Sequence, residues 1–214
     1  MNNFEIWDNA FQILALLCAM ALSGMTGIHW QSRRAVVLAC WYASFMLGTL
    51  FYTLHITIIG DIPRIFYVAD ISWLAAYLFL LLLMTLRADV EKNGVPFNGP
   101  AAGCAALTFA AAMYNEIFGP SKLMSCAFGL FAAGIVYLAV LKILECRKSA
   151  EPVPKFDIIA VIVIFLQIFL YFVSVYISDY TRFNLYFAVD ILLTLHMVSL
   201  TYFLRKEVKQ DDAY

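Results

Sequence analysis

The apolar residues of this chain gather into seven stretches, each about long enough to cross a bilayer as a helix. A hydrocarbon core roughly 30 Å thick requires about 20 apolar residues of helix. The pattern predicts spans over residues 8–29, 35–59, 65–86, 101–118, 122–144, 156–178 and 183–204. Short loops and two short tails make up the remainder. The predicted fold is therefore an all-α integral membrane protein, with residues 1–214 forming one seven-helix domain.

The basic residues predict how the chain threads the membrane, because cytoplasmic loops collect Lys and Arg. With the N-terminus outside, only Arg64, Lys122 and Arg182 of the 14 Lys and Arg residues face outward. If the Ala-rich stretch 101–118 did not cross, eight of the 14 would face outward. We therefore expect seven spans in the plasma (cytoplasmic) membrane, with the N-terminus outside and the C-terminus in the cytoplasm.

Composition agrees with this class. The chain is 64% hydrophobic and 14% charged, with a mean hydropathy of +0.83, well above soluble usage. A net charge of -1 gives no reason to expect a nucleic-acid partner. Residues 1–8 carry Glu5 and Asp8 but no Lys or Arg, so we expect no cleavable signal peptide. The expected surroundings are the lipid bilayer, and no cofactor is predicted.

An internal repeat is predicted by shifting the chain by 120 residues. Residues 66–71 then align with 186–191, and this register sets Asp70 on Asp190. The repeat halves are about 1–92 and 122–209, which leaves 101–118 as a connector. Because four crossings separate equivalent helices, the two halves have the same direction. The chain is thus predicted to follow a three-plus-one-plus-three plan.

This plan resembles that of sugar transporters of the SWEET type. Those proteins carry a proline in the first helix of each three-helix unit and an asparagine deep in the third. In this chain all six prolines lie in or next to predicted loops, and Asp70 and Asp190 stand near the expected asparagine positions. The resemblance is therefore limited to architecture, and the chain is not assigned to that family.

Charged side chains inside a membrane are costly, so Asp70 and Asp190 are the first candidates for function. Each lies about 10–12 Å from the outer end of its predicted helix at 1.5 Å per residue. If the halves are related by a pseudo-twofold axis, the two carboxylates face each other across the interior. We therefore expect a small-ligand pocket in the outer half of the bundle, formed by Asp70, Asp190, Trp73, Tyr77, His55, Tyr67, Tyr186, Thr194, Asn115, Glu116 and Gln12.

Aromatic residues at the same depth decide which ligand such a pocket would suit. Tyr52 and Tyr171 join the predicted wall, and carboxylates with aromatic rings favour a cationic or hydroxyl-rich ligand. The alternative is structural: each Asp caps a helix or is neutralised by Arg64 or Arg182, and the tyrosines form an interfacial belt.

A second polar pair, Gln167 and His196, is predicted near the middle of the bilayer. It is either a candidate proton relay or a hydrogen-bonded link between helices.

Several chemistries are disfavoured by the residues present. No lysine lies between Phe183 and Leu204, where a retinal Schiff base would need one. The only three histidines, His29, His55 and His196, are too spread along the spans to bind one metal ion, so no metal site is predicted. An intramembrane hydrolase that uses the Asp pair as acid and base remains one alternative.

Two function classes therefore lead. The first is a ligand-binding membrane sensor or receptor, which would signal through a cytoplasmic partner. The second is a small-solute transporter, coupled to protons or cations, favoured by the repeat and the acidic pair. The absence of prolines within the spans and the shallow depth of the carboxylates favour the sensor, and catalysis is less expected than either.

Overall fold

The computed structural model describes residues 4–60, 68–88, 90, 94–116, 122–150, 152–177 and 179–211. These residues form helices and connections, with no strand among them. The helices are α1 (Phe4–His29), α2 (Arg33–Ile58), α3 (Val68–Arg87), α5 (Gly99–Glu116), α6 (Lys122–Lys148), α7 (Lys155–Ser174) and α8 (Leu185–Asp211).

Six of these helices are long and apolar enough to cross a membrane. The exception within the described residues is α5, which is apolar but shorter. The structure thus confirms the prediction of a helical, multi-pass membrane protein and six of its long apolar spans. The seventh crossing remains a prediction.

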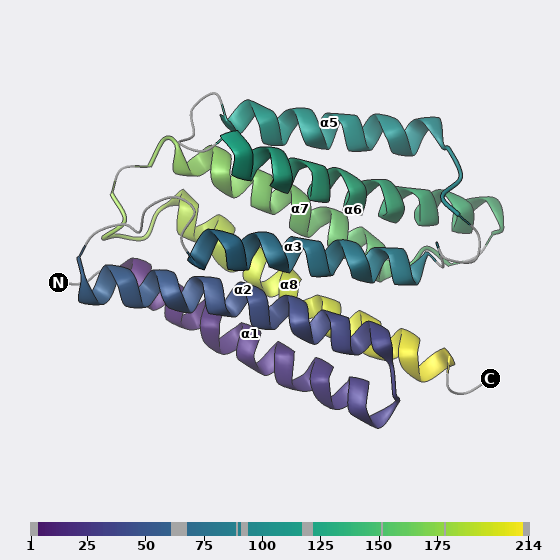
Figure 1. Cartoon of the computed structure of the whole chain (residues 1–214), viewed down its shortest axis with the longest axis horizontal. Coiled ribbons are helices and arrows are strands. Elements are labelled where there is room, and N and C mark those ends of the chain that lie inside the picture. The colour runs from purple at the N-terminus through teal and green to yellow at the C-terminus, as the bar shows by residue number, and fades with distance from the viewer. Residues whose placement is uncertain are drawn as a thin grey trace.

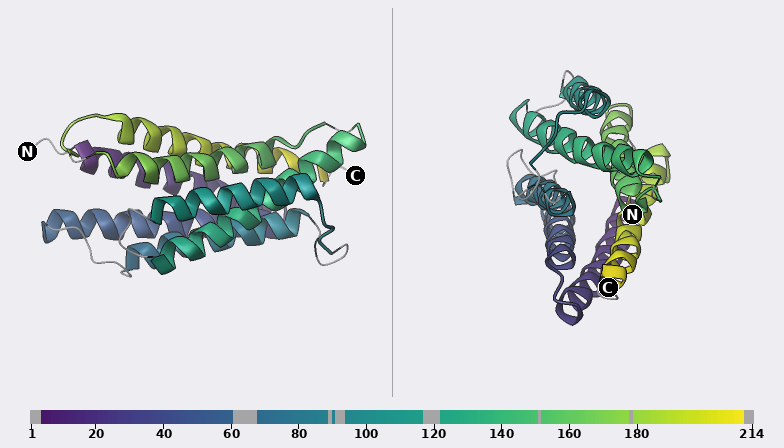
Figure 2. Two further views of the ribbon diagram at one scale, coloured as in Figure 1. Left: turned by 90° about the horizontal axis from the view of Figure 1, so that it is seen from above. Right: turned by 90° about the vertical axis from the view of Figure 1, so that its right-hand side faces the viewer.

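The helices are arranged as a ring around the long axis of the molecule (Figures 1 and 2). Helix α1 packs against α2 and α8, α3 packs against α2 and α6, and α7 packs against α6 and α8. Helix α5 lies outside this ring, where it contacts α6 and α7. The two chain ends lie at opposite ends of the bundle.

We call the end at which α1 and α8 begin the cavity end, and the opposite end the basic end. Helix termini at the basic end carry most of the described Lys and Arg residues: Arg33, Arg34, Arg87, Lys142, Arg147, Lys148, Lys155, Arg205, Lys206 and Lys209. The structure therefore places at one end of the bundle the ten described residues among the eleven basic residues that are predicted to face the cytoplasm; the eleventh, Lys92, lies outside the described residues.

The chain reverses from α1 to α2 through a tight turn that brings these helices together. Gln31 adopts a positive φ of 46°, and the Ser32 side chain caps α2 by accepting a hydrogen bond from the Ala35 backbone N–H at 3.4 Å. Beside the turn, Gly27 leaves no room for a side chain, because a Cβ there would lie 2.7 Å from Val36. The close approach holds the two helices in register.

The middle of the ring is filled by apolar side chains. Leu16, Leu80, Leu83, Leu193 and Met197 are all completely buried. One polar link crosses this level: the Tyr42 hydroxyl donates to the Met197 carbonyl at 2.6 Å and accepts from Thr201 at 2.9 Å. A layer of buried, mostly apolar side chains therefore lies between the two ends.

The predicted repeat is consistent with the helix bounds but is not established by them. Shifted by 120 residues, α1, α2 and α3 begin and end within four residues of α6, α7 and α8. In addition, α1 packs against α8, and the equivalent pair is α6 against α3. The repeat stays a prediction.

Candidate functional site

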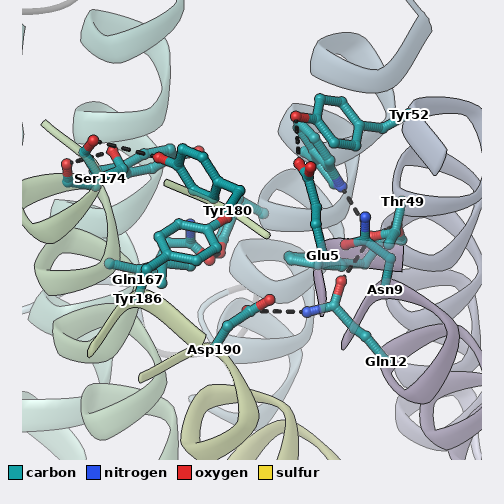
Figure 3. A pocket seen from close by; sticks show the side chains of 15 residues that line it. Glu5, Asn9, Gln12, Thr49, Tyr52, Gln167, Ser174, Tyr180, Tyr186 and Asp190 are labelled. Carbon is teal, nitrogen blue, oxygen red and sulfur yellow. Dashed lines mark hydrogen bonds between the residues drawn. The ribbon is translucent and has the colours of Figure 1, made fainter. Parts of the chain in front are cut away.

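A cavity of about 300 Å³ lies inside the ring at the cavity end. Five helices and the α7–α8 connection contribute its walls, as Figure 3 shows. The lining residues are Glu5, Asn9, Gln12, Phe45, Thr49, Tyr52, Trp73, Tyr77, Gln167, Leu170, Tyr171, Ser174, Tyr180, Tyr186 and Asp190. The volume is at the lower end of the range for small-molecule sites.

The floor of the cavity is organised by Gln12 of α1. Its Nε2 donates to Asp190 Oδ1 at 3.1 Å and to Thr194 Oγ1 at 3.2 Å, both on α8. Its Oε1 accepts from Thr49 Oγ1 of α2 at 2.7 Å. One amide therefore ties three helices together and holds the Asp190 carboxyl group in a fixed position (Figure 3).

Aromatic side chains account for seven of the 15 lining residues. The Tyr77 hydroxyl donates to Gln167 Oε1 at 2.6 Å, which links α3 to α7. The ring of Trp73 lies 5.9 Å from that of Tyr52, and its Nε1 lies 3.4 Å from Thr49 Oγ1. These contacts hold the rings in place, so the wall is rigid and presents π faces and ring edges to the interior.

The mouth is shaped by the start of α1 and by the connection between α7 and α8. The backbone N–H groups of Phe4 and Glu5 donate to the carbonyls of Thr181 and Tyr180 at 3.3 Å, which satisfies two donors at the helix N-terminus. Glu5 Oε1 accepts from the Tyr52 hydroxyl at 3.0 Å. Both side chains point toward each other at the mouth (Figure 3).

The α7–α8 connection is held by its own hydrogen bonds. Asp179 accepts from the Thr181 hydroxyl at 2.6 Å and from the Thr181 backbone N–H at 2.9 Å. These hydrogen bonds hold the pKa of the Asp179 carboxyl below its ordinary value. Burial raises the pKa of the neighbouring Tyr180 phenol, so Tyr180 faces the cavity as a neutral group.

The cavity has a one-sided electrostatic character. Among the described lining residues, Glu5 and Asp190 are acidic and none is Lys, Arg or His. Asn9 Nδ2 is buried and has no hydrogen-bond partner among the described residues. A buried donor without a partner requires an acceptor from water or a ligand.

The structure brings five of the residues predicted for the pocket into one cavity, Gln12, Trp73, Tyr77, Tyr186 and Asp190, and adds Gln167 of the predicted deeper pair. Thr194 lies just beneath them, fully enclosed and bonded to Gln12. Tyr52 and Tyr171, expected in the wall, also line the cavity. Tyr67 falls outside the described residues, as do the side chains of Asn115 and Glu116.

The cavity does not contain the expected pair of Asp70 and Asp190. Asp70 is half-buried in the first turn of α3 and does not line the cavity, although it lies near enough to Tyr171 to act on it electrostatically. The described contacts of the Asp190 carboxyl are with Gln12 and with Asp8. The difference arises because α1, not α3, packs against α8.

Two predicted histidines also lie elsewhere. His55 is half-buried near the end of α2 and does not line the cavity. His196 is close to the Leu192 carbonyl of its own helix, with Nδ1 at 2.8 Å from the oxygen. The expected pair of Gln167 and His196 is therefore split, with Gln167 in the cavity and His196 outside it.

Sequence reasoning missed the contribution of the first turns of α1. The predicted span begins at residue 8, whereas α1 begins at Phe4. The spacing of the polar residues could have indicated this. The sequence has polar residues three or four positions apart, on one helix face, at Glu5, at Asp8 or Asn9, and at Gln12. Thr49 was missed because one threonine in a long apolar helix carries little information.

Gly48 of α2 is a sensitive point in the wall. A Cβ there would lie 2.7 Å from two atoms of the Trp73 indole and 3.1 Å from the Ala69 carbonyl oxygen. We expect Gly48→Ala to displace Trp73 and to destabilise the protein by about 1–3 kcal/mol. The measurement is the thermal midpoint in detergent, together with a shift in tryptophan emission that disappears in a Trp73→Phe background.

Gly24→Ala is the matched control, because a Cβ at Gly24 meets nothing within 4 Å. Equal thermal midpoints for the two variants would show that the Trp73 wall is not packed as described.

Comparisons with protein-family models, with curated proteins and with solved structures found no match to this chain. Among the described residues, no group of three or more His, Cys, Asp or Glu side chains is placed to hold a metal ion. The site must therefore be interpreted from its own chemistry.

Proposed function

We propose that this protein is a membrane receptor that binds a small organic cation in the cavity. The observation that carries the proposal is the composition of the wall: two carboxyl groups, seven aromatic rings and no basic side chain among the 15 lining residues. Aromatic faces attract cations, and the attraction reaches about 2 kcal/mol or more where water is excluded. An anionic ligand would meet Glu5 and Asp190 with no compensating charge.

The shape and the polar groups narrow the ligand class. A volume of about 300 Å³ suits a molecule of modest size. The free Asn9 Nδ2 favours a ligand that also carries an oxygen acceptor. An amino alcohol or a quaternary ammonium alcohol combines both features.

A receptor function is supported by the packing beneath the cavity. The side chains of Leu16, Leu193 and Met197 are completely buried between the cavity and the basic end. The basic end is proposed to face the cytoplasm, since cytoplasmic segments are enriched in Lys and Arg. The cavity would then open outward, and a cytoplasmic partner would respond to the conformation of the basic end.

Choline and its uncharged isostere 3,3-dimethylbutan-1-ol test the proposal, because they differ mainly in charge. We expect the purified protein to bind choline about 30-fold more tightly, as a cation–aromatic contribution of about 2 kcal/mol implies. Isothermal titration calorimetry in detergent micelles measures both affinities. Equal affinities, or binding of neither molecule, would overturn the proposal.

Transport is a second candidate, favoured by the equivalent packing of α1 on α8 and of α6 on α3. Radiolabelled choline and proteoliposomes separate the two functions. A receptor binds choline without accumulating it inside the vesicles, whereas a transporter exchanges internal for external label. Exchange above that of protein-free vesicles would replace the receptor proposal by the transporter.

A further inference from the structure

The carboxyl group of Asp190 contacts a second carboxyl group, that of Asp8. Asp8 is on α1 and 4% exposed, and Asp190 is on α8 and 6% exposed. Helix α1 packs against α8, and Gln12, one turn further along α1 than Asp8, bonds to Asp190, so the two buried carboxyl groups lie close enough to interact. Two carboxylates buried beside each other repel, so both cannot readily be ionised. The pair is therefore expected to hold one proton.

The position of this pair relates it directly to the cavity. Asp190 lines the floor, whereas Asp8 is almost fully buried and is not a lining residue. The Gln12 amide donates to Asp190 Oδ1, which leaves the rest of the carboxyl group for Asp8 and for the cavity. An arriving cation would thus meet a carboxyl group that already shares a proton.

Among the described residues that line the cavity, none adds a positive charge beside the pair. On α1, Glu5 lies one turn nearer the mouth and is acidic. The remaining titratable groups of the lining are phenols from α2, α3, α7, the α7–α8 connection and α8, namely Tyr52, Tyr77, Tyr171, Tyr180 and Tyr186. None of the lining residues is basic. The shared proton is therefore the counter-charge that the site itself provides.

We propose that the Asp8–Asp190 pair exchanges its shared proton for the cationic ligand, so that one proton is released to water for each cation bound. This inference rests on the cation site proposed above. The exchange balances charge: the protonated pair carries one negative charge, and two carboxylates with one bound cation also carry one. Because net charge is costly to place in a site shielded from water, the exchange avoids adding any.

Linkage fixes the sign of the pH dependence. Protons and ligand compete for the same pair, so the apparent affinity rises with pH while the pair is protonated. The expected slope is about tenfold in affinity per pH unit for one proton released per cation. The affinity stops rising once the pH is high enough for the pair to lose its proton without ligand.

The experiment measures protons released per choline bound by the purified full-length chain. Choline carries a fixed charge, so any proton released comes from the protein. Titration calorimetry in two buffers of different ionisation enthalpy gives the proton count directly, between about pH 5 and pH 8. We expect about one proton per choline at the acidic end of this range.

Asp8→Asn tests the assignment to this pair. Its amide still donates to Asp190 but holds no exchangeable proton in this range, so choline should bind with nearly no proton release and with pH-independent affinity. Asp70→Asn is the matched control, because Asp70 is an acidic residue of α3, a helix that packs against neither α1 nor α8, and it does not line the cavity. It should leave the proton count unchanged.

The outcomes separate the two proposals. Choline binding without proton release in the unmodified protein overturns the exchange and leaves the receptor proposal standing. No binding of choline at any pH overturns both. Proton release that persists in a folded Asp8→Asn variant, or is lost in Asp70→Asn, removes Asp8 from the mechanism. The unmodified protein decides the exchange by itself if Asp8→Asn does not fold.

Discussion

Replacing Arg87 with methionine is expected to destabilise the protein by about 3–5 kcal/mol, the largest effect of a single substitution that the structure indicates. Arg87 ends α3, with its side chain 1% exposed, and its Nη2 lies 2.6 Å from Asp157 Oδ2 of α7. It also pairs with Glu207 of α8. The guanidinium stacks over the Phe156 ring, 4.1 Å from its centroid.

The size of the effect follows from the charge that stays buried when Arg87 is lost. Asp157 is fully buried, so loss of Arg87 leaves a carboxylate in a dry site without its nearest cation. Lys142 cannot replace it directly, since its Nζ donates to the Arg87 backbone carbonyl at 2.8 Å. Burying an uncompensated charge costs several kcal/mol, whereas replacing the whole pair by apolar groups of similar size is often nearly neutral.

Unfolding in mixed micelles with increasing SDS, followed by circular dichroism, measures the effect. The double variant Arg87→Met with Asp157→Leu should regain most of the lost stability, because no buried charge is then left alone. Arg205→Met is the control at the same end: Arg205 is exposed and lies 5.7 Å from the Trp30 ring centroid. It should cost about 0.5–1 kcal/mol at most.

If Arg87→Met costs no more than Arg205→Met, the cluster of Arg87, Asp157 and Glu207 does not hold α3, α7 and α8 together. If the double variant is as unstable as the single one, the loss comes from packing of the long side chain and not from the stranded charge.

Asp190→Asn is expected to weaken choline binding by about 10- to 150-fold, which corresponds to the 1.5–3 kcal/mol of an interaction with a charged partner. Asp190 is the acidic residue of the floor, and the Gln12 amide keeps its carboxyl group turned to the cavity. The asparagine keeps the size and a hydrogen-bonding group, so the wall and the fold should survive.

The measurement is titration calorimetry with choline and with 3,3-dimethylbutan-1-ol on the same preparations. The affinity for the uncharged isostere should stay within about threefold, because it depends on the aromatic wall and not on the carboxylate. A folded Asp190→Asn variant with unchanged choline affinity would exclude Asp190 as the cation partner. Equal weakening of both molecules would point instead to a collapsed floor.

Arg87 and Asp190 lie toward opposite ends of the bundle. Helix α3 carries Tyr77 in the cavity wall and ends at Arg87, and α8 carries Asp190 in the floor and Glu207 near its end. The aromatic and polar groups of the cavity and the ionic cluster of the basic end are therefore joined by rigid helices across a packed apolar middle.

Residues of α3 and α8 show how much of the cavity can be predicted from the spacing along a single helix. On α8, Tyr186, Asp190, Thr194 and Met197 recur at helical spacing, which predicts one inward face, and all four are buried or line the cavity. On α3, the same spacing places Asp70, Trp73 and Tyr77 on one face, and Trp73 and Tyr77 line the cavity. Asp70 does not reach the cavity, because it lies in the first turn of its helix.

The sequence by itself determined that this is a multi-pass helical membrane protein, six of its long apolar spans and which faces of α3 and α8 turn inward, because hydropathy and helical periodicity are local properties. Only the tertiary structure decided that Asp190 meets Asp8 and Gln12 instead of Asp70, and that Arg87 joins Asp157 and Glu207. These partners are 70 to 182 residues apart. Which helices become neighbours depends on how whole apolar faces pack, and no single helix carries that information.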